Sequence, residues 1–224
     1  MSGKVNNLRT GIKKVLNMAE KEKKHGVPVS TKKRAEPRKV YLIQNKLPSC
    51  YIIFDLGAGS GVYIPYLSQK AKHVVALDIN KKDYEEVARK GNEFVLADAK
   101  HLPFRNEIFD ALWASEIVEH FESLKPLDEL ERVTKKIILI TMPNPLSPHF
   151  KRDPTHLLKY SVISLEKYFK KRSKRTSNKY MIRGLGFDEV PIPKIMKLFT
   201  MFATWFIPIL SPTITVIGVN KDLK

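Results

Sequence analysis

The strongest constraint on the fold is an apolar run that breaks into three alternating glycines. Residues 52–56 are Ile-Ile-Phe-Asp-Leu, and glycines follow at positions 57, 59 and 61. A parallel strand is buried on both faces, so its sequence is a continuous apolar run. A glycine-rich turn after such a strand lets the backbone approach a ligand at a helix N-terminus. The pattern predicts a strand, a turn that binds a nucleotide-like cofactor, and a helix over residues 62–70.

The spacing of the glycines narrows the choice of cofactor. A dinucleotide-binding turn has glycines at its first, third and sixth positions. Here the sixth position is Val62, and the third glycine comes one residue early, at Gly61. The spacing therefore argues against a dinucleotide.

Further apolar runs follow, and several of them end in an acidic residue. The run 73–78 ends in Asp78, which lies 21 residues after Gly57. That interval is close to the roughly 20 residues at which a carboxylate contacts ribose hydroxyls. Later runs cover residues 92–99, 109–120 and 136–141. Ligands of open α/β sheets bind beyond the carboxyl ends of the strands, so Asp78 is predicted to bind a ribose.

Residues 55–61, Asp-Leu-Gly-Ala-Gly-Ser-Gly, resemble motif I of the class I S-adenosylmethionine-dependent methyltransferases. From about residue 41 to 190, the order of elements is similar to the small methyltransferases called type 11. The shared fragments are Glu119-His120, Pro143-Asn144-Pro145, Asp153-Pro154-Thr155-His156 and Gly186-Phe187. The resemblance implies an α/β fold, a Rossmann-like three-layer sandwich. It also implies a seven-stranded, mainly parallel sheet whose last strand, residues 213–219, is antiparallel.

The resemblance also implies a set of cofactor-binding residues for S-adenosylmethionine. The glycines allow close backbone approach, Asp55 orders the turn and the amino acid end, and Asp98 with Ala99 meets the adenine. A competing interpretation of Asp55 or Asp98 is a cap at a helix start. The predicted cofactor-binding residues are Asp55, Gly57, Ala58, Gly59, Gly61, Asp78, Ile79, Asp98, Ala99, Ser115 and Glu116.

Two histidines are the candidate catalytic residues. If the acceptor is a hydroxyl or an acidic carbon, methyl transfer needs a general base within hydrogen-bond reach. His120 follows the fourth strand and His156 lies in the next long loop, and histidine titrates near neutral pH. Glu119 and Tyr160 stand behind them as further candidates. The competing interpretations are a helix cap for His120 and a structural hydrogen bond for His156.

No metal site is predicted. In-line displacement at a methyl group needs an aligned nucleophile rather than a metal. The single cysteine, Cys50, excludes a disulfide within the chain and a zinc site made of several cysteines.

The net charge of +17 is unevenly distributed. Residues 1–50 carry +10 and residues 151–183 carry +9, whereas residues 52–150 carry −3. An acidic cofactor half suits the sulfonium cation of S-adenosylmethionine. The competing explanation is that nucleotide-binding folds place carboxylates at strand ends in any case.

Residues 1–40 are predicted to form a basic N-terminal helix and linker, followed by a methyltransferase domain over residues 41–224. This basic arm, residues 1–40, either caps the active site or contacts an anionic partner, such as RNA or a membrane surface. No aromatic residue between Lys4 and Lys39 is available to stack on bases. A second basic run, residues 170–179, is predicted to be a mobile surface loop, which is either merely solvated or part of a basic face for a polyanionic substrate.

An apolar insertion covers about residues 192–210. It is too short and interrupted for a membrane-spanning helix, which needs about 20 apolar residues. The open alternatives are a cover over a hydrophobic acceptor, an interfacial membrane contact, and a core or homodimer helix. No apolar stretch follows the first charges, which predicts a cytoplasmic location, with peripheral membrane contact as the alternative.

The leading expectation for function is methyl transfer to a small-molecule or lipid-like acceptor. No Asn-Pro-Pro-Tyr signature of amino-group methylation follows the fourth strand. The alternative is an RNA or protein methyltransferase that uses the basic arm and residues 170–179. A cofactor-binding protein without catalysis is the third. The acceptor itself is not predicted, because a fold does not determine a substrate.

Overall fold

The structure is a computed structural model that describes residues 35–89, 93–147, 150–151, 153–185, 203 and 211–222. The expectations for the helix of the basic arm and for the Gly186-Phe187 turn lie outside these residues. The apolar insertion lies outside them too, apart from Ala203.

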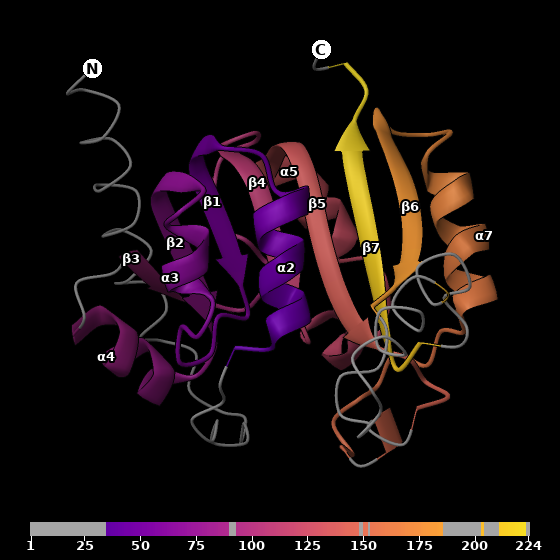
Figure 1. Ribbon diagram of the computed structural model, residues 1–224, viewed down its shortest axis with the longest axis horizontal. Coiled ribbons are helices and arrows are strands. Elements are labelled where there is room, and N and C mark those ends of the chain that lie inside the picture. The colour runs from indigo at the N-terminus through magenta and orange to yellow at the C-terminus, as the bar shows by residue number, and fades with distance from the viewer. Residues whose placement is uncertain are drawn as a thin grey trace.

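One sheet organises the described part of the chain (Figure 1). Its strand order is β3-β2-β1-β4-β5-β7-β6. The strands are β1 (Cys50–Leu56), β2 (Ala71–Asp78), β3 (Glu93–Leu96), β4 (Phe109–Ser115), β5 (Thr134–Pro143), β6 (Asn178–Gly184) and β7 (Thr213–Asn220). Strands β3, β2, β1, β4 and β5 are parallel to one another, whereas β7 runs antiparallel to both β5 and β6. The predicted mainly parallel sheet with an antiparallel last strand is confirmed.

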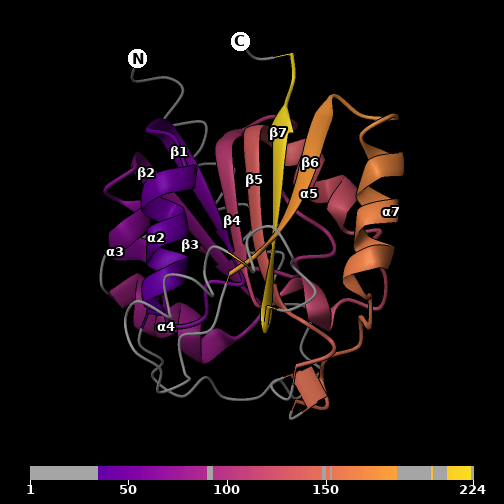
Figure 2. The ribbon, with the colours of Figure 1, turned by 45° about the vertical axis from the view of Figure 1, so that its right-hand side comes forward.

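Helices cover both faces of this sheet (Figures 1 and 2). They are α2 (Pro37–Lys46), α3 (Ile64–Leu67), α4 (Lys81–Arg89), η1 (Val118–His120), α5 (Leu127–Val133) and α7 (Val162–Arg172). Helices α2, α3 and α4 pack into one apolar cluster, and α5 and α7 pack into another. The predicted three-layer sandwich is confirmed.

Successive side chains of each strand point to opposite faces of the sheet and so contribute to both clusters. In β1, Phe54 packs in the cluster of α5 and α7, whereas its neighbour Ile53 packs in the cluster of α2, α3 and α4. In β4, Leu112 packs in the cluster of α5 and α7, and Trp113 packs in the other cluster. All four of these side chains are fully buried. Burial on both faces explains why the central strands are continuous apolar runs in the sequence.

The helix predicted over residues 62–70 is much shorter in the structure. Helix α3 has four residues, and the chain before it stays in turns closed by bonds from Gly61 N to Ala58 O and from Ile64 N to Gly61 O. After α3, Lys70 N bonds to Leu67 O, and Lys70 O accepts from Cys50 N at the start of β1. Tight three-residue turns at both ends replace the expected helical turns.

The loop predicted over residues 170–179 is shorter in the structure. Residues 170–172 form the last turn of α7, and residues 178–179 belong to β6. The cause is Arg172, whose guanidinium forms ion pairs with Asp128 and Glu131 of α5 and so holds the end of α7 in place.

Helix α2 begins inside the stretch expected to be a linker. Pro37 occupies its first turn, where a missing N–H is tolerated, and Leu42 and Ile43 are fully buried in the core. Within the described ranges, no helix is long and apolar enough to cross a membrane.

Candidate active site

The glycine turn lies where the strand order of the sheet reverses. Strands β2 and β3 lie on one side of β1 and strands β4 and β5 on the other, with Leu56 level with Ala114. In open α/β sheets, ligands bind at this switch point, beyond the carboxyl ends of the strands. The predicted turn and His120 thus follow two neighbouring strands, β1 and β4.

The backbone of the turn requires glycine. Gly57, Gly59 and Gly61 have φ angles of +69°, +51° and +75°, which side chains of L-residues rarely adopt. A Cβ atom at Gly57 would also lie 2.9 Å from the Cβ of Ile117, so no larger residue fits without a shift. These backbone angles explain why the turn is made of glycines, whereas the approach of a ligand to its backbone stays a prediction.

Asp78 joins the ends of β1 and β2. Its Oδ2 accepts a hydrogen bond from Gly59 N at 2.8 Å, and its Oδ1 accepts one from Asn80 N at 2.9 Å. Each carboxylate oxygen has a further lone pair, so the group can still accept bonds from ribose hydroxyls. The next residue, Ile79, is 49% exposed and offers an apolar surface beside this carboxylate.

Asp55 is a buried carboxyl group with an unsatisfied oxygen. It is 2% exposed, and its Oδ2 has no hydrogen-bond partner among the described residues. Burial and the nearby charge of Asp78 raise the pKa of Asp55 to about 8. An orphaned acceptor beside the glycine turn fits a cationic ligand. The amino acid end of S-adenosylmethionine, with its ammonium and sulfonium groups, has that chemistry.

Asp98 makes a local bond within a turn and not at the start of a helix, so it is not the helix cap of the alternative interpretation. Its Oδ1 accepts from Lys100 N at 2.8 Å, in the turn after β3. Ala99 beside it is buried in the core. The contact of both residues with adenine stays a prediction.

Glu116 follows β4 in a strained conformation. Its φ angle is +55°, although it is not a glycine, and its backbone N–H donates to Thr141 O at 2.9 Å. Ser115 before it accepts a bond from the Thr141 hydroxyl at 3.1 Å. Such strain occurs often at functional sites, where the surrounding structure holds it in place.

A buried lysine that the sequence analysis missed pairs with Glu116. Lys39 of α2 is 2% exposed, and its Nζ lies 3.1 Å from Glu116 Oε1 and 2.9 Å from Glu36 Oε1. Burial alone would lower the pKa of Lys39, but Glu116 and Glu36 raise it above its ordinary value. The available signal was its position, three and four residues before the buried Leu42 and Ile43 on one helix face.

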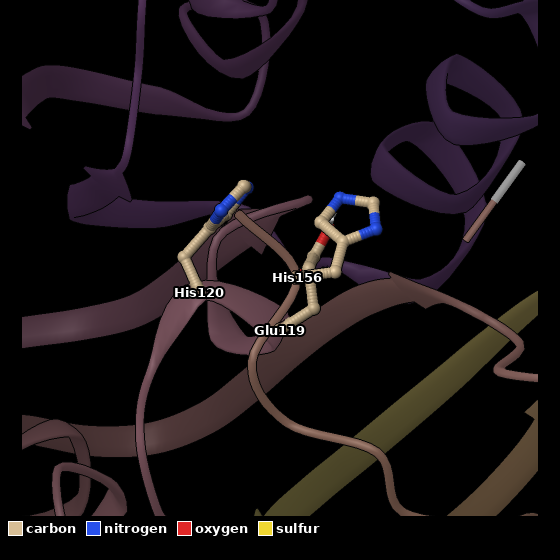
Figure 3. Close-up of side chains that lie close together, drawn as sticks. All are labelled: Glu119, His120 and His156. Carbon is tan, nitrogen blue, oxygen red and sulfur yellow. Dashed lines mark ion pairs between the residues drawn. The ribbon is translucent and has the colours of Figure 1, made fainter. Parts of the chain in front are cut away.

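The two predicted histidines lie together, with Glu119 beside them (Figure 3). The rings of His120 and His156 have centroids 5.0 Å apart, and His156 Nε2 lies 4.0 Å from Glu119 Oε1. His156 comes from the loop between β5 and α7. This loop is fixed to η1 because Leu157 N and Leu158 N donate to the backbone oxygen of Glu119.

Hydrogen bonds determine which nitrogen of each ring carries the proton. His156 Nδ1 lies 2.9 Å from the carbonyl oxygen of Phe150, and His120 Nδ1 lies 3.2 Å from that of Thr155. A carbonyl oxygen only accepts, so both Nδ1 atoms are donors. In the neutral rings, both Nε2 atoms therefore keep a lone pair. Burial, and then the neighbouring His156, lower the pKa of His120, which favours its neutral form.

Glu119 is the most enclosed member of this cluster. It is fully buried, and neither of its carboxylate oxygens has a hydrogen-bond partner among the described residues. Burial and the charge of Glu116 raise the pKa of Glu119 well above its ordinary value. The sequence analysis placed Glu119 behind the histidines, but the structure places its carboxylate among them. Tyr160, the other reserve candidate, packs against the apolar core.

Residues 54–138 match the family model of a methyltransferase domain. Over these residues the chain has the sequence of a methyltransferase domain. The resemblance to class I, type 11-like methyltransferases is confirmed, and with it the expected cofactor of the domain, S-adenosylmethionine.

Curated relatives of this methyltransferase domain differ in the acceptor that their names give. A human probable tRNA methyltransferase 9B is 31% identical over 51% of this chain and 27% of that protein. A demethylmenaquinone methyltransferase from Clavibacter sepedonicus is 36% identical over 51% of each chain. The chain thus spans from about a quarter to half the length of these relatives.

A solved structure supports the fold over a longer stretch. A SAM-dependent methyltransferase from Archaeoglobus fulgidus superposes with a TM-score of 0.60, covering 81% of this chain and 92% of that one. The sequence identity is 17%, so this likeness establishes the fold of the methyltransferase domain and not its acceptor.

Proposed function

We propose that the chain transfers the methyl group of S-adenosylmethionine to an oxygen or acidic carbon of a small-molecule or lipid-like acceptor. One contact carries the proposal. The position of a Cβ at Gly57 lies 2.9 Å from Ile117, two residues before Glu119. The turn that suits the cofactor and the segment that bears the candidate base are therefore in direct contact.

On the cofactor side, residues of the chain would bind and orient S-adenosylmethionine. Asp78 would accept bonds from ribose hydroxyls, and the orphaned oxygen of Asp55 would face positive charge at the amino acid end. Bound S-adenosylmethionine supplies an electrophilic methyl group on a sulfonium. Because displacement is in line, the main task of the protein is to align the acceptor atom about 3 Å from that methyl group.

On the acceptor side, His120 and His156 present Nε2 lone pairs. Their Nδ1 atoms are held by backbone carbonyls, so the rings are oriented before any acceptor arrives. An acceptor O–H or acidic C–H loses its proton toward this cluster as its bond to the methyl carbon forms and the methyl–sulfur bond breaks, leaving the electron pair on sulfur. Release of the demethylated cofactor completes the reaction.

An RNA acceptor is the second candidate, and two observations favour it. Lys171, Lys174, Arg175 and Lys179 of the basic run are exposed, and several relatives are named as tRNA methyltransferases or probable ones. Against it, Arg172 of the same run is engaged in ion pairs within the fold and is withdrawn from any partner. We therefore rank the small-molecule or lipid-like acceptor first.

Incubation of the chain with methyl-labelled S-adenosylmethionine and a cell extract tests the proposal. The extract is then fractionated into lipid, small-molecule, RNA and protein pools. Label in the lipid or small-molecule pool, lost with Asp78→Ala, is the expected result. Label in the RNA or protein pool would overturn the acceptor class. An absence of label in every pool, with the cofactor bound, would overturn the activity.

A further inference from the structure

The Glu119 carboxylate and the His156 ring face each other without a bond between them. His156 Nδ1 donates to Phe150 O, so the Nε2 that lies 4.0 Å from Glu119 Oε1 presents a lone pair to an oxygen. A distance of 4.0 Å is too long for a hydrogen bond. Glu119 is fully buried and both of its oxygens are unsatisfied within the described part of the chain. A cation bound between them would satisfy both the carboxylate and the imidazole lone pair.

The outer contacts of the two rings are those of metal-binding histidines. A metal-bound histidine usually donates its other ring N–H to a carbonyl or carboxylate, which fixes the tautomer and the ring orientation. His156 does so to Phe150 O. His120 does so to Thr155 O, and Thr155 Oγ1 lies 3.0 Å from the same nitrogen and donates to Asp153 Oδ1 at 2.6 Å. His156 Nε2 thus lies toward Glu119, and the Nδ1 contacts of His120 leave its Nε2 as the nitrogen available to a ligand.

We propose that Glu119, His120 and His156 bind a divalent transition-metal ion. Their ligand atoms all lie within 4.8 Å of one another. Bonds of about 2.0–2.2 Å to imidazole nitrogen and carboxylate oxygen need a closer spacing, so the side chains draw inward when the ion binds. Two imidazoles and one carboxylate suit Zn²⁺, Fe²⁺, Mn²⁺ or Co²⁺ better than Ca²⁺, which takes oxygen ligands.

Further negative charge surrounds the cluster and favours a cation there. Asp153 Oδ2 lies 3.8 Å from His156 Nε2, and its side chain is 42% exposed at the rim. Glu116 also acts electrostatically on Glu119, although Lys39 pairs its charge. Three protein ligands leave coordination positions open for a substrate oxygen, and a bound ion would then replace the histidine lone pairs in assisting the loss of the acceptor's proton. This last role rests on the proposed methyl transfer, whereas ion binding itself does not.

Cobalt binding by the untagged, chelator-treated protein tests the site. Co²⁺ is titrated in while its visible absorption bands and the heat of binding are recorded. We expect one ion per chain, with the affinity lowered at least ~10-fold in His156→Ala and in Glu119→Gln. His101→Ala, which removes an exposed histidine outside the cluster, is the matched control and should bind as the wild type does.

S-adenosylmethionine binding by each variant serves as the measure of folding. If Glu119→Gln misfolds, it loses binding of the cofactor as well as of the ion. In that case His156→Ala decides the test, provided that it still binds the cofactor. The inference is overturned by the absence of saturation below about 1 mM Co²⁺, or by equal affinity in His156→Ala and the wild type. Such a failure leaves the proposed methyl transfer standing, because that function fails only if the wild type neither binds the cofactor nor transfers its methyl group.

Discussion

Among single residues, Asp55 links the candidate site to the stability of the domain. Folding buries its carboxyl group next to Asp78 and raises its pKa from 3.8 to about 8. Between these values the unfolded chain has lost a proton that the folded chain keeps. The contribution of Asp55 to the free energy of unfolding is therefore fully present below pH 3.8 and is lost as the pH rises toward 8.

Asp55→Asn should remove this pH dependence. The amide stays neutral, so the free energy of unfolding of the variant should rise relative to the wild type as the pH increases from 5 to 8. The change should approach about 1.4 kcal/mol per pH unit. Denaturant unfolding at several pH values measures it, with the exposed Asp222→Asn as control. A difference that is constant or shrinks with pH would contradict the assigned pKa.

Single residues also mark the limit of sequence reasoning. The glycines of residues 57–61 were recognisable because their spacing reflects a backbone requirement that is local to the turn. The pairing of Lys39 with Glu116 was not recognisable from the sequence, since the two residues lie 77 positions apart and meet only when α2 packs against the sheet. The approach of Glu119 to His156 has the same long-range origin.

At the scale of elements, one arginine joins α7 to α5. Arg172 Nη2 lies 2.7 Å from Asp128 Oδ1 and 2.6 Å from Glu131 Oε2, and Nε donates to Glu131 Oε1 at 2.8 Å. Tyr180 of β6 donates to the same Glu131 oxygen. The side chains of Arg172 and Glu131 are each 11% exposed, so water does little to screen this pair.

Arg172→Ala should destabilise the domain by about 2 kcal/mol, because it leaves the Glu131 carboxylate buried without its cation. Thermal and denaturant unfolding give the value. Lys171→Ala, one residue earlier and exposed, is the matched control and should change stability by less than about 0.5 kcal/mol. Equal effects of the two substitutions would contradict the structural role of Arg172.

The accuracy of the predicted elements followed from how locally each is determined. The parallel strands were predicted from apolar runs, because burial on both faces leaves its mark on consecutive residues. The helix over residues 62–70 and the loop over residues 170–179 were wrong. Tight turns shorten the first, and partners on α5, about 40 residues earlier in the chain, extend α7 into the second.

At the scale of the whole molecule, the sheet order creates the candidate site. The reversal between β1 and β4 places the glycine turn beside the segment that carries Glu119 and His120. The sequence predicted both sides of the site separately, on strand ends. Their contact through Ile117 depends on the packing of neighbouring strands and was not predictable from local pattern. The acceptor depends on surfaces that neither the fold nor the relatives' names determine.

The central claim is that this turn and Asp78 hold S-adenosylmethionine. Calorimetric titration of the cofactor tests it most directly, with the exposed Asp222→Ala as the control variant. We predict saturable binding of one molecule per chain to the wild type and the control. Asp78→Ala should bind several-fold more weakly while it keeps a cooperative unfolding transition. Absence of binding by the wild type, or an unchanged dissociation constant in Asp78→Ala, would contradict the account.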